Sequence, residues 1–156
     1  MRPSSFRFGT AAATAAIAFS CALWAPSAQA TLGSNAASVD ANQHALVATR
    51  QIVKLPSGER HDLALPSGVI VREYVAPGGA VYAVSWSGPR MPDLHEILGP
   101  YFAQLGAHAS HGGHHRMNLA GQDFVVRSSG HGHAFSGRAW VPSLVPAGVD
   151  LAATFE

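Results

Sequence analysis

Three turn motifs at near-regular spacing limit the length of the strands that this chain can form. The tetrapeptide Leu-Pro-Ser-Gly occurs at 55–58 and again at 65–68, and Pro-Gly-Gly follows at 77–79. Proline fixes φ and glycine accepts a positive φ, and tight turns need both. The segments after the second and third turns are rich in β-branched and aromatic residues, whereas the segment after the first turn has a weaker strand pattern. All three are predicted as strands of a β-meander: 59–65, 69–75 and 80–86.

The periodicity changes from two to helical after Gly88. Asp93 can cap a helix with Glu96 three residues later, and apolar residues then recur at helical spacing up to Leu105. Pro100 lacks a backbone N–H, so the sequence predicts either a kink at this point or two short helices.

Two further strands, 122–128 and 133–141, are predicted as a hairpin joined at 129–132. The summed expectation is an α+β domain, a strongly curled antiparallel meander of about five strands with one covering helix. A small β-barrel is the alternative. The predicted organisation has four parts: a signal peptide at 1–30, a flexible leader or short helix at 31–50, a single domain at 51–156, and within it a His-rich loop at 106–121.

The N-terminal segment has the three parts of a secretory signal peptide. Arg2 and Arg7 make a positive start, an apolar stretch covers 8–24, and Ala-Gln-Ala at 28–30 is a small-x-small cleavage site. Cleavage before Thr31 predicts an exported protein, periplasmic or secreted, with no membrane span after the cut.

Cleavage would also remove the only cysteine, Cys21, and with it any disulfide or thiolate chemistry. The alternative is a lipoprotein acylated at Cys21. Two of the ten Lys and Arg leave with the signal, so eight remain against nine Asp and Glu. The linear sequence then has no basic stripe, and nucleic acid is not an expected partner.

Six histidines form the most distinctive cluster of candidate ligands. Neutral imidazole binds zinc, copper and nickel, and a loop with closely spaced histidines can wrap several rings around one ion. No cofactor is expected otherwise, and zinc or copper is the candidate ion. The alternative is a solvated, low-complexity loop in which histidine is only polar filler. The candidate ligands are His108, His111, His114, His115, His131 and His133.

The sequence suggests two further hypotheses, an arginine patch and a serine hydrolase. Arg72, Arg127 and Arg138 could form cross-strand ion pairs, with Glu73 among the partners, or an anion-binding patch if their strands are neighbours. A hydrolase would need a nucleophile, but no serine has the Gly-x-Ser-x-Gly context of a nucleophile elbow. The serines considered are Ser57, Ser67, Ser85, Ser136 and Ser143.

Several segments together resemble a family of small exported proteins of Gram-negative bacteria that is known as a domain of unknown function. The resemblance covers roughly 58–149 and implies a single exported domain, but it carries no activity or ligand. The segments that carry it are 69–75 (VIVREYV), 84–89 (VSWSGP), 92–94 (PDL), 98–102 (LGPYF), 134–139 (AFSGRA) and 142–149 (PSLVPAGV).

The sequence therefore predicts a non-enzymatic binding or interaction domain with an envelope or extracellular partner that the sequence does not identify. Transition-metal binding by the His-rich loop is the first alternative, and a hydrolase is the second.

Overall fold

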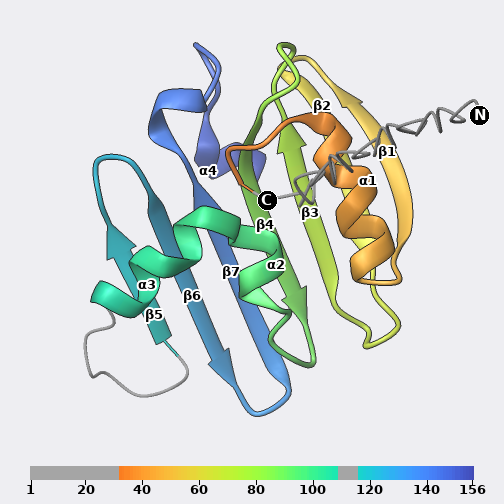
Figure 1. Ribbon diagram of the computed structural model, residues 1–156, viewed down its shortest axis with the longest axis vertical. Coiled ribbons are helices and arrows are strands. Elements are labelled where there is room, and N and C mark those ends of the chain that lie inside the picture. Colours follow the sequence, from red (N-terminus) through yellow and green to blue (C-terminus); the bar gives the residue numbers. More distant parts are fainter. Residues whose placement is uncertain (1–31, 109–115) are drawn as a thin grey trace, which may run out of the picture.

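The computed structural model describes residues 32–108 and 116–156, which form an α+β fold around one open antiparallel sheet (Figure 1). The sheet has seven strands in the order β1-β2-β3-β4-β7-β6-β5, and every neighbouring pair is antiparallel. The strands are β1 (Thr49–Leu55), β2 (Gly58–Ala64), β3 (Ile70–Val75), β4 (Val81–Gly88), β5 (Arg116–Ala120), β6 (Val125–His131) and β7 (Ala134–Trp140).

The three motifs form turns as predicted, and these turns join the first four strands. Leu55 lies opposite Gly58 across a two-residue turn between β1 and β2. Gly58 has a φ of +130°, and a Cβ there would lie 2.0 Å from the carbonyl oxygen of Val75. This turn therefore requires glycine on two grounds, because both the backbone angle and the close approach exclude a side chain. The predicted hairpin between β6 and β7 is also present, with its turn at Gly132 and His133.

The predicted strand number and sheet shape are wrong. Seven strands replace about five because β1 and β5 were missed, and β5 lies inside the predicted loop at 106–121. The sheet is also open, neither curled nor closed into a small β-barrel. β1 and β5 are the two edges, with the other five strands between them. Helical segments spread along one face, so the apolar side chains are buried without closure of the sheet.

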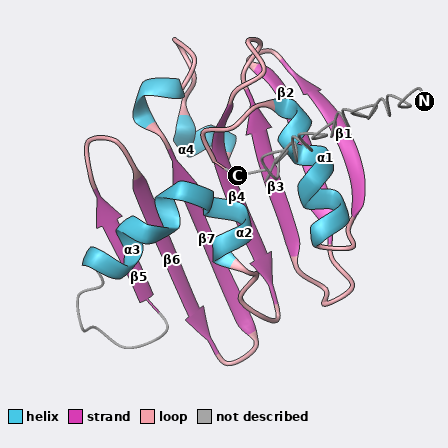
Figure 2. Cartoon of the chain, viewed as in Figure 1, coloured by secondary structure: helices cyan, strands magenta, loops and turns pink. Residues whose placement is uncertain are grey.

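Short helices cover one face of the sheet, which we call the helical face (Figure 2). The segment predicted as one helix is broken as expected: Asp93 Oδ1 accepts a hydrogen bond from the backbone N–H of His95 at 2.9 Å, and the helix is interrupted at Pro100. No helix in the described ranges is both long and apolar enough to cross a membrane. The helices of this face are α1 (Ala36–Ala45), α2 (Leu94–Leu98), η1 (Gly99–Tyr101) and α3 (Phe102–His108).

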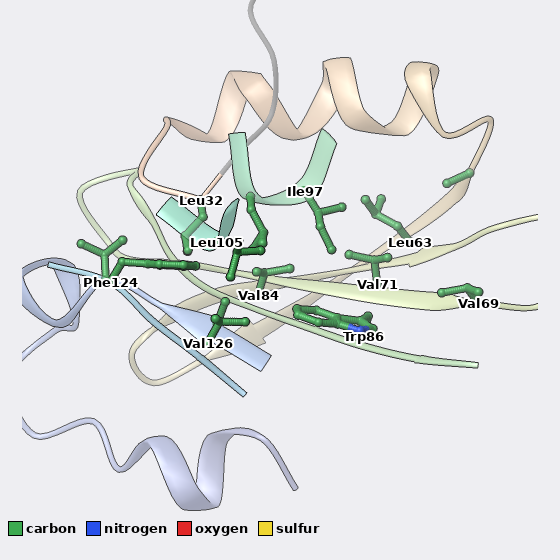
Figure 3. Packing of buried hydrophobic residues seen from close by; sticks show 14 residues of the cluster. Leu32, Leu63, Val69, Val71, Val84, Trp86, Ile97, Leu105, Phe124 and Val126 are labelled. Carbon is green, nitrogen blue, oxygen red and sulfur yellow. The ribbon is translucent and has the colours of Figure 1, made fainter. Parts of the chain in front are cut away.

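In the segment 31–50, predicted as a flexible leader or a short helix, the structure has a helix, α1, from Ala36 to Ala45. Leu32, just before α1, and Val39, within it, are fully buried, and the backbone N–H of Gly33 donates to the carbonyl oxygen of Val81 at 2.9 Å. The main core lies between these helices and the sheet, where Ile97 and Leu105 pack with residues such as Val84 (Figure 3).

The C-terminal segment lies on the opposite side of the sheet from α1 and α2 (Figure 3). It contains η2 (Pro142–Leu144) and α4 (Leu151–Thr154). Phe155 packs with Tyr74 and Trp140, with ring centroids 5.5 and 5.9 Å apart. This second apolar cluster covers one part of that face, and polar residues of β4, β5, β6 and β7 lie beside it.

Candidate anion-binding face

Arginines from three separate strands lie in one row on the sheet face opposite the helical face. Residues directly opposite each other on neighbouring strands project from the same face. Arg72 of β3 lies opposite Ser85 of β4, which lies opposite Arg138 of β7. Arg138 lies opposite Arg127 of β6, and Arg127 lies opposite Asn118 of β5. The sheet thus assembles a basic row that the linear sequence does not show.

A second row of polar residues runs beside the first, offset from it by two residues on each strand. Ser87, Ser136, Ser129 and Arg116 follow one another across β4, β7, β6 and β5. The two rows border an open hollow of about 530 Å³. We call this surface the arginine face and define it by nine residues: Arg72, Ser85, Ser87, Arg116, Asn118, Arg127, Ser129, Ser136 and Arg138.

Aromatic rings support two of the arginines. The guanidinium carbon of Arg127 lies 5.8 Å from the centroid of the Trp140 ring, and that of Arg138 lies 5.5 Å from the Phe155 ring. Cation–π contacts of this kind hold a guanidinium in place and leave its N–H groups available for a ligand. Among the ion pairs between described residues, none involves Arg116, Arg127 or Arg138.

Among the ion pairs between described residues, one involves the first row, and it joins Arg72 to Asp62 on the neighbouring strand β2. Asp62 is 3.9 Å from the Nε atom of Arg72 but 2.7 Å from that of Arg60. Asp62 is engaged mainly with Arg60, because its two carboxylate oxygens accept hydrogen bonds from Nε and Nη2 of Arg60 at 2.7 and 3.0 Å, and this hydrogen bonding raises the pKa of Arg60. Glu73 cannot neutralise the row, because successive strand residues face opposite sides and Glu73 is buried on the helical face. The predicted network of cross-strand ion pairs is therefore wrong for Glu73.

Two like charges lie directly opposite each other at the centre of the arginine face. Arg127 and Arg138 are a cross-strand pair, and like charges in this arrangement repel. An anion placed between them would relieve the repulsion and accept charge-assisted hydrogen bonds from both guanidinium groups. The neighbouring serine hydroxyl groups can donate or accept further hydrogen bonds. This chemistry suits the binding of carboxylate, sulfate or phosphate groups.

The candidate serines lie in turns, strands and a 3₁₀ helix. Ser136 is in the middle of β7, not at a strand-to-helix turn, and Ser85 has its Oγ 3.5 Å from the hydroxyl oxygen of Tyr74. Both contribute to the arginine face. Ser57 and Ser67 lie in the first two turns, and Ser143 lies in η2.

The candidate metal ligands are only partly described. His111, His114 and His115 lie outside the described residues, and His108 is the last residue of α3. His131 and His133 are exposed at the tip of the β6–β7 hairpin. Within the described ranges, no group of three or more His, Cys, Asp or Glu side chains is placed to hold a metal ion.

Sequence reasoning missed four residues of the arginine face: Ser87, Arg116, Asn118 and Ser129. Arg127 and Ser129 share a face by period two, but the predicted strand ended at residue 128, so Ser129 was assigned to the turn, whereas β6 continues to His131. Arg116 and Asn118 could not have been found, because the segment that contains them was predicted as a loop. Their place depends on the pairing of β5 with β6, in which Asn118 lies opposite Arg127.

Comparison with known proteins gives one match. A family model described as a protein of unknown function (DUF2844) matches residues 28–153. No curated protein and no solved structure matches the chain.

Proposed function

The chain belongs to the DUF2844 family of proteins of unknown function, and we propose from its own geometry that it is a binding domain whose arginine face takes an anionic ligand. We further propose that it is exported, works in the periplasm or outside the cell, and is not an enzyme. The signal-peptide pattern at 1–30 supports the export proposal.

One observation carries this proposal: the in-register row of Arg72, Arg138 and Arg127. Eight Lys and Arg follow the predicted cleavage site, and four of them belong to the arginine face. Part of this arrangement is unfavourable for a sheet on its own, because the charges of Arg127 and Arg138 lie directly opposite each other and repel. It is favourable when a negatively charged ligand neutralises the row.

Titration of the purified protein with citrate, followed by calorimetry, tests the proposal. Citrate is a compact probe that carries several carboxylates. We expect saturable binding that weakens by about tenfold in Arg138→Gln, because the variant loses a charge-assisted hydrogen bond to the ligand. Thermal unfolding of the wild-type protein should also move to a higher temperature with citrate, since a ligand that binds only the folded state stabilises it.

Arg90→Gln is the matched control. Arg90 is exposed just after β4 and is not part of the arginine face, so its loss changes the net charge by the same amount. We expect its citrate affinity to stay within about twofold of the wild type. Equal losses of citrate affinity in the two variants would show that the effect comes only from the overall charge. The absence of any citrate binding would disprove the proposal.

Transition-metal binding stays the alternative prediction. The hairpin tip that carries His131 and His133 lies at the end of the sheet where β5 begins, since Arg116 pairs with Ser129. If the histidines bind zinc or copper, calorimetry should give submicromolar binding that weakens at least about tenfold when His111, His114 and His115 are replaced by alanine. Metal binding whose affinity does not change after these replacements would contradict the alternative.

A further inference from the structure

The two rows of the arginine face run across the strands, not along them. The first row goes from Arg72 on β3 to Asn118 on β5, one residue per strand. Five strands have four spacings of about 4.8 Å, so this row spans about 19 Å. Arg138 and Arg127 are one spacing apart, whereas Arg72 is two spacings from Arg138. A compact anion held between Arg127 and Arg138 would therefore not reach Arg72.

We infer, on the premise of the proposed function, that the natural ligand is an extended acidic polysaccharide lying across the strands of the arginine face. Carboxylate or sulfate groups along the chain would pair with Arg72, Arg138 and Arg127 of the first row, and the sugar between Arg72 and Arg138 would lie over Ser85. Sugar hydroxyl groups would exchange hydrogen bonds with Ser87, Ser136 and Ser129 along the second row.

The shape of the site favours a chain over a compact ligand. The hollow is open, and four cationic side chains line it, whereas small molecules are usually bound in enclosed and mostly apolar pockets. An extended ligand with repeating negative groups engages all the arginines at once. Each additional contact within one molecule then adds to the affinity, as in multivalent binding.

The aromatic rings favour a polysaccharide over a nucleic acid. Proteins that bind single-stranded nucleic acid offer free aromatic faces on which bases stack. Here Trp140 lies beneath the guanidinium of Arg127, and Phe155 beneath that of Arg138. Both rings also pack into the cluster formed with the C-terminal segment. The rows offer hydroxyl groups and guanidinium groups in place of stacking platforms.

Oligomers of galacturonate of increasing length, measured by calorimetry on the purified protein, test the inference. We expect affinity to rise at least about tenfold from the single sugar to an oligomer that spans about 19 Å, and then to level off. Oligomers with methyl-esterified carboxylates have the same sugars without the charge. They should bind at least about tenfold more weakly than the acid form.

Arg72→Gln separates an extended ligand from a compact one. The substitution should weaken binding of the spanning oligomer by about tenfold and binding of the single sugar by no more than about twofold, because only the oligomer reaches β3. Arg90→Gln serves again as the control and should change neither affinity. An unchanged melting temperature of the free variants would show that the fold is intact.

The outcomes distinguish this inference from the proposed function. If citrate and single galacturonate bind in an Arg138-dependent way, with no gain from length and no effect of Arg72→Gln, the polysaccharide inference fails and the anion-binding function stands. If no anion binds, both fail. A single-stranded DNA oligonucleotide of matching length that binds more tightly than oligogalacturonate would overturn the inference in favour of a nucleic acid.

Discussion

Replacing Gly137 with alanine is expected to lower the free energy of unfolding by about 3 kcal/mol. Gly137 lies directly opposite Trp86 on the neighbouring strand, and the indole ring covers the glycine. A Cβ at this position would lie 2.2 Å from Cζ2 of Trp86 and 2.9 Å from Cβ of Ser128. Trp86 is almost fully buried, so the ring cannot move away without disturbing the core (Figure 3). Urea denaturation measures the loss.

Gly78→Ala is the matched control for this substitution. Gly78 is exposed in the turn between β3 and β4, and a Cβ there would contact nothing within 4 Å. The control should change stability by no more than about 0.5 kcal/mol. In a Trp86→Phe background the smaller ring leaves room, so the cost of Gly137→Ala should fall to about 1 kcal/mol. A cost that is the same in both backgrounds would contradict the role given to the indole ring.

Replacing Phe155 with alanine is expected to affect both stability and ligand binding. The ring packs edge-on against Tyr74 and lies below the guanidinium of Arg138. Its loss should lower the free energy of unfolding by about 2 kcal/mol, less than for a fully buried phenylalanine because Phe155 is only half-buried. Citrate affinity should fall as well, by roughly threefold to tenfold, because Arg138 is no longer held over an aromatic face.

Two variants separate the contributions of Phe155. Phe155→Leu keeps an apolar side chain but removes the aromatic face, so it should recover most of the stability and little of the citrate affinity. Phe102→Ala removes a phenylalanine that is 38% exposed at the start of α3, and it should cost less than about 1 kcal/mol without any effect on citrate. If Phe155→Leu binds citrate as the wild type does, the contact between Phe155 and Arg138 has no part in binding.

Local features of the sequence were sufficient for five of the strands and for the broken helix. The turns at 55–58, 65–68 and 77–79 depend on the backbone angles of proline and glycine, which act within a few residues. The break at Pro100 depends on a missing backbone donor, which is a property of one residue. The two missed strands are the edges of the sheet. An edge strand has one neighbour and more exposed side chains, so β5 has too weak a pattern to be found without its partner.

The candidate site was predicted only in part, because its arrangement also depends on which strands are neighbours. Arg72, Arg127 and Arg138 were recognised as an anion-binding patch only on the condition that their strands are neighbours. β6 and β7 are neighbours, but β4 lies between β3 and β7. Because β4 pairs with β7 instead of with the next strand along the chain, Arg72 still lies in the same row as the other two arginines. The partner of a strand is chosen by contacts between residues far apart in the sequence, which no local pattern reports.

The sequence by itself determined where the chain turns, where its helix breaks and which residues of each strand share a face, because these follow from backbone angles and side-chain alternation. Only the tertiary structure decided that the sheet is open and that Trp86 covers Gly137. It also decided that arginines from four strands form one face on a chain with almost no net charge. Each of these depends on which strands lie side by side and in what register, and that choice is made by the whole core.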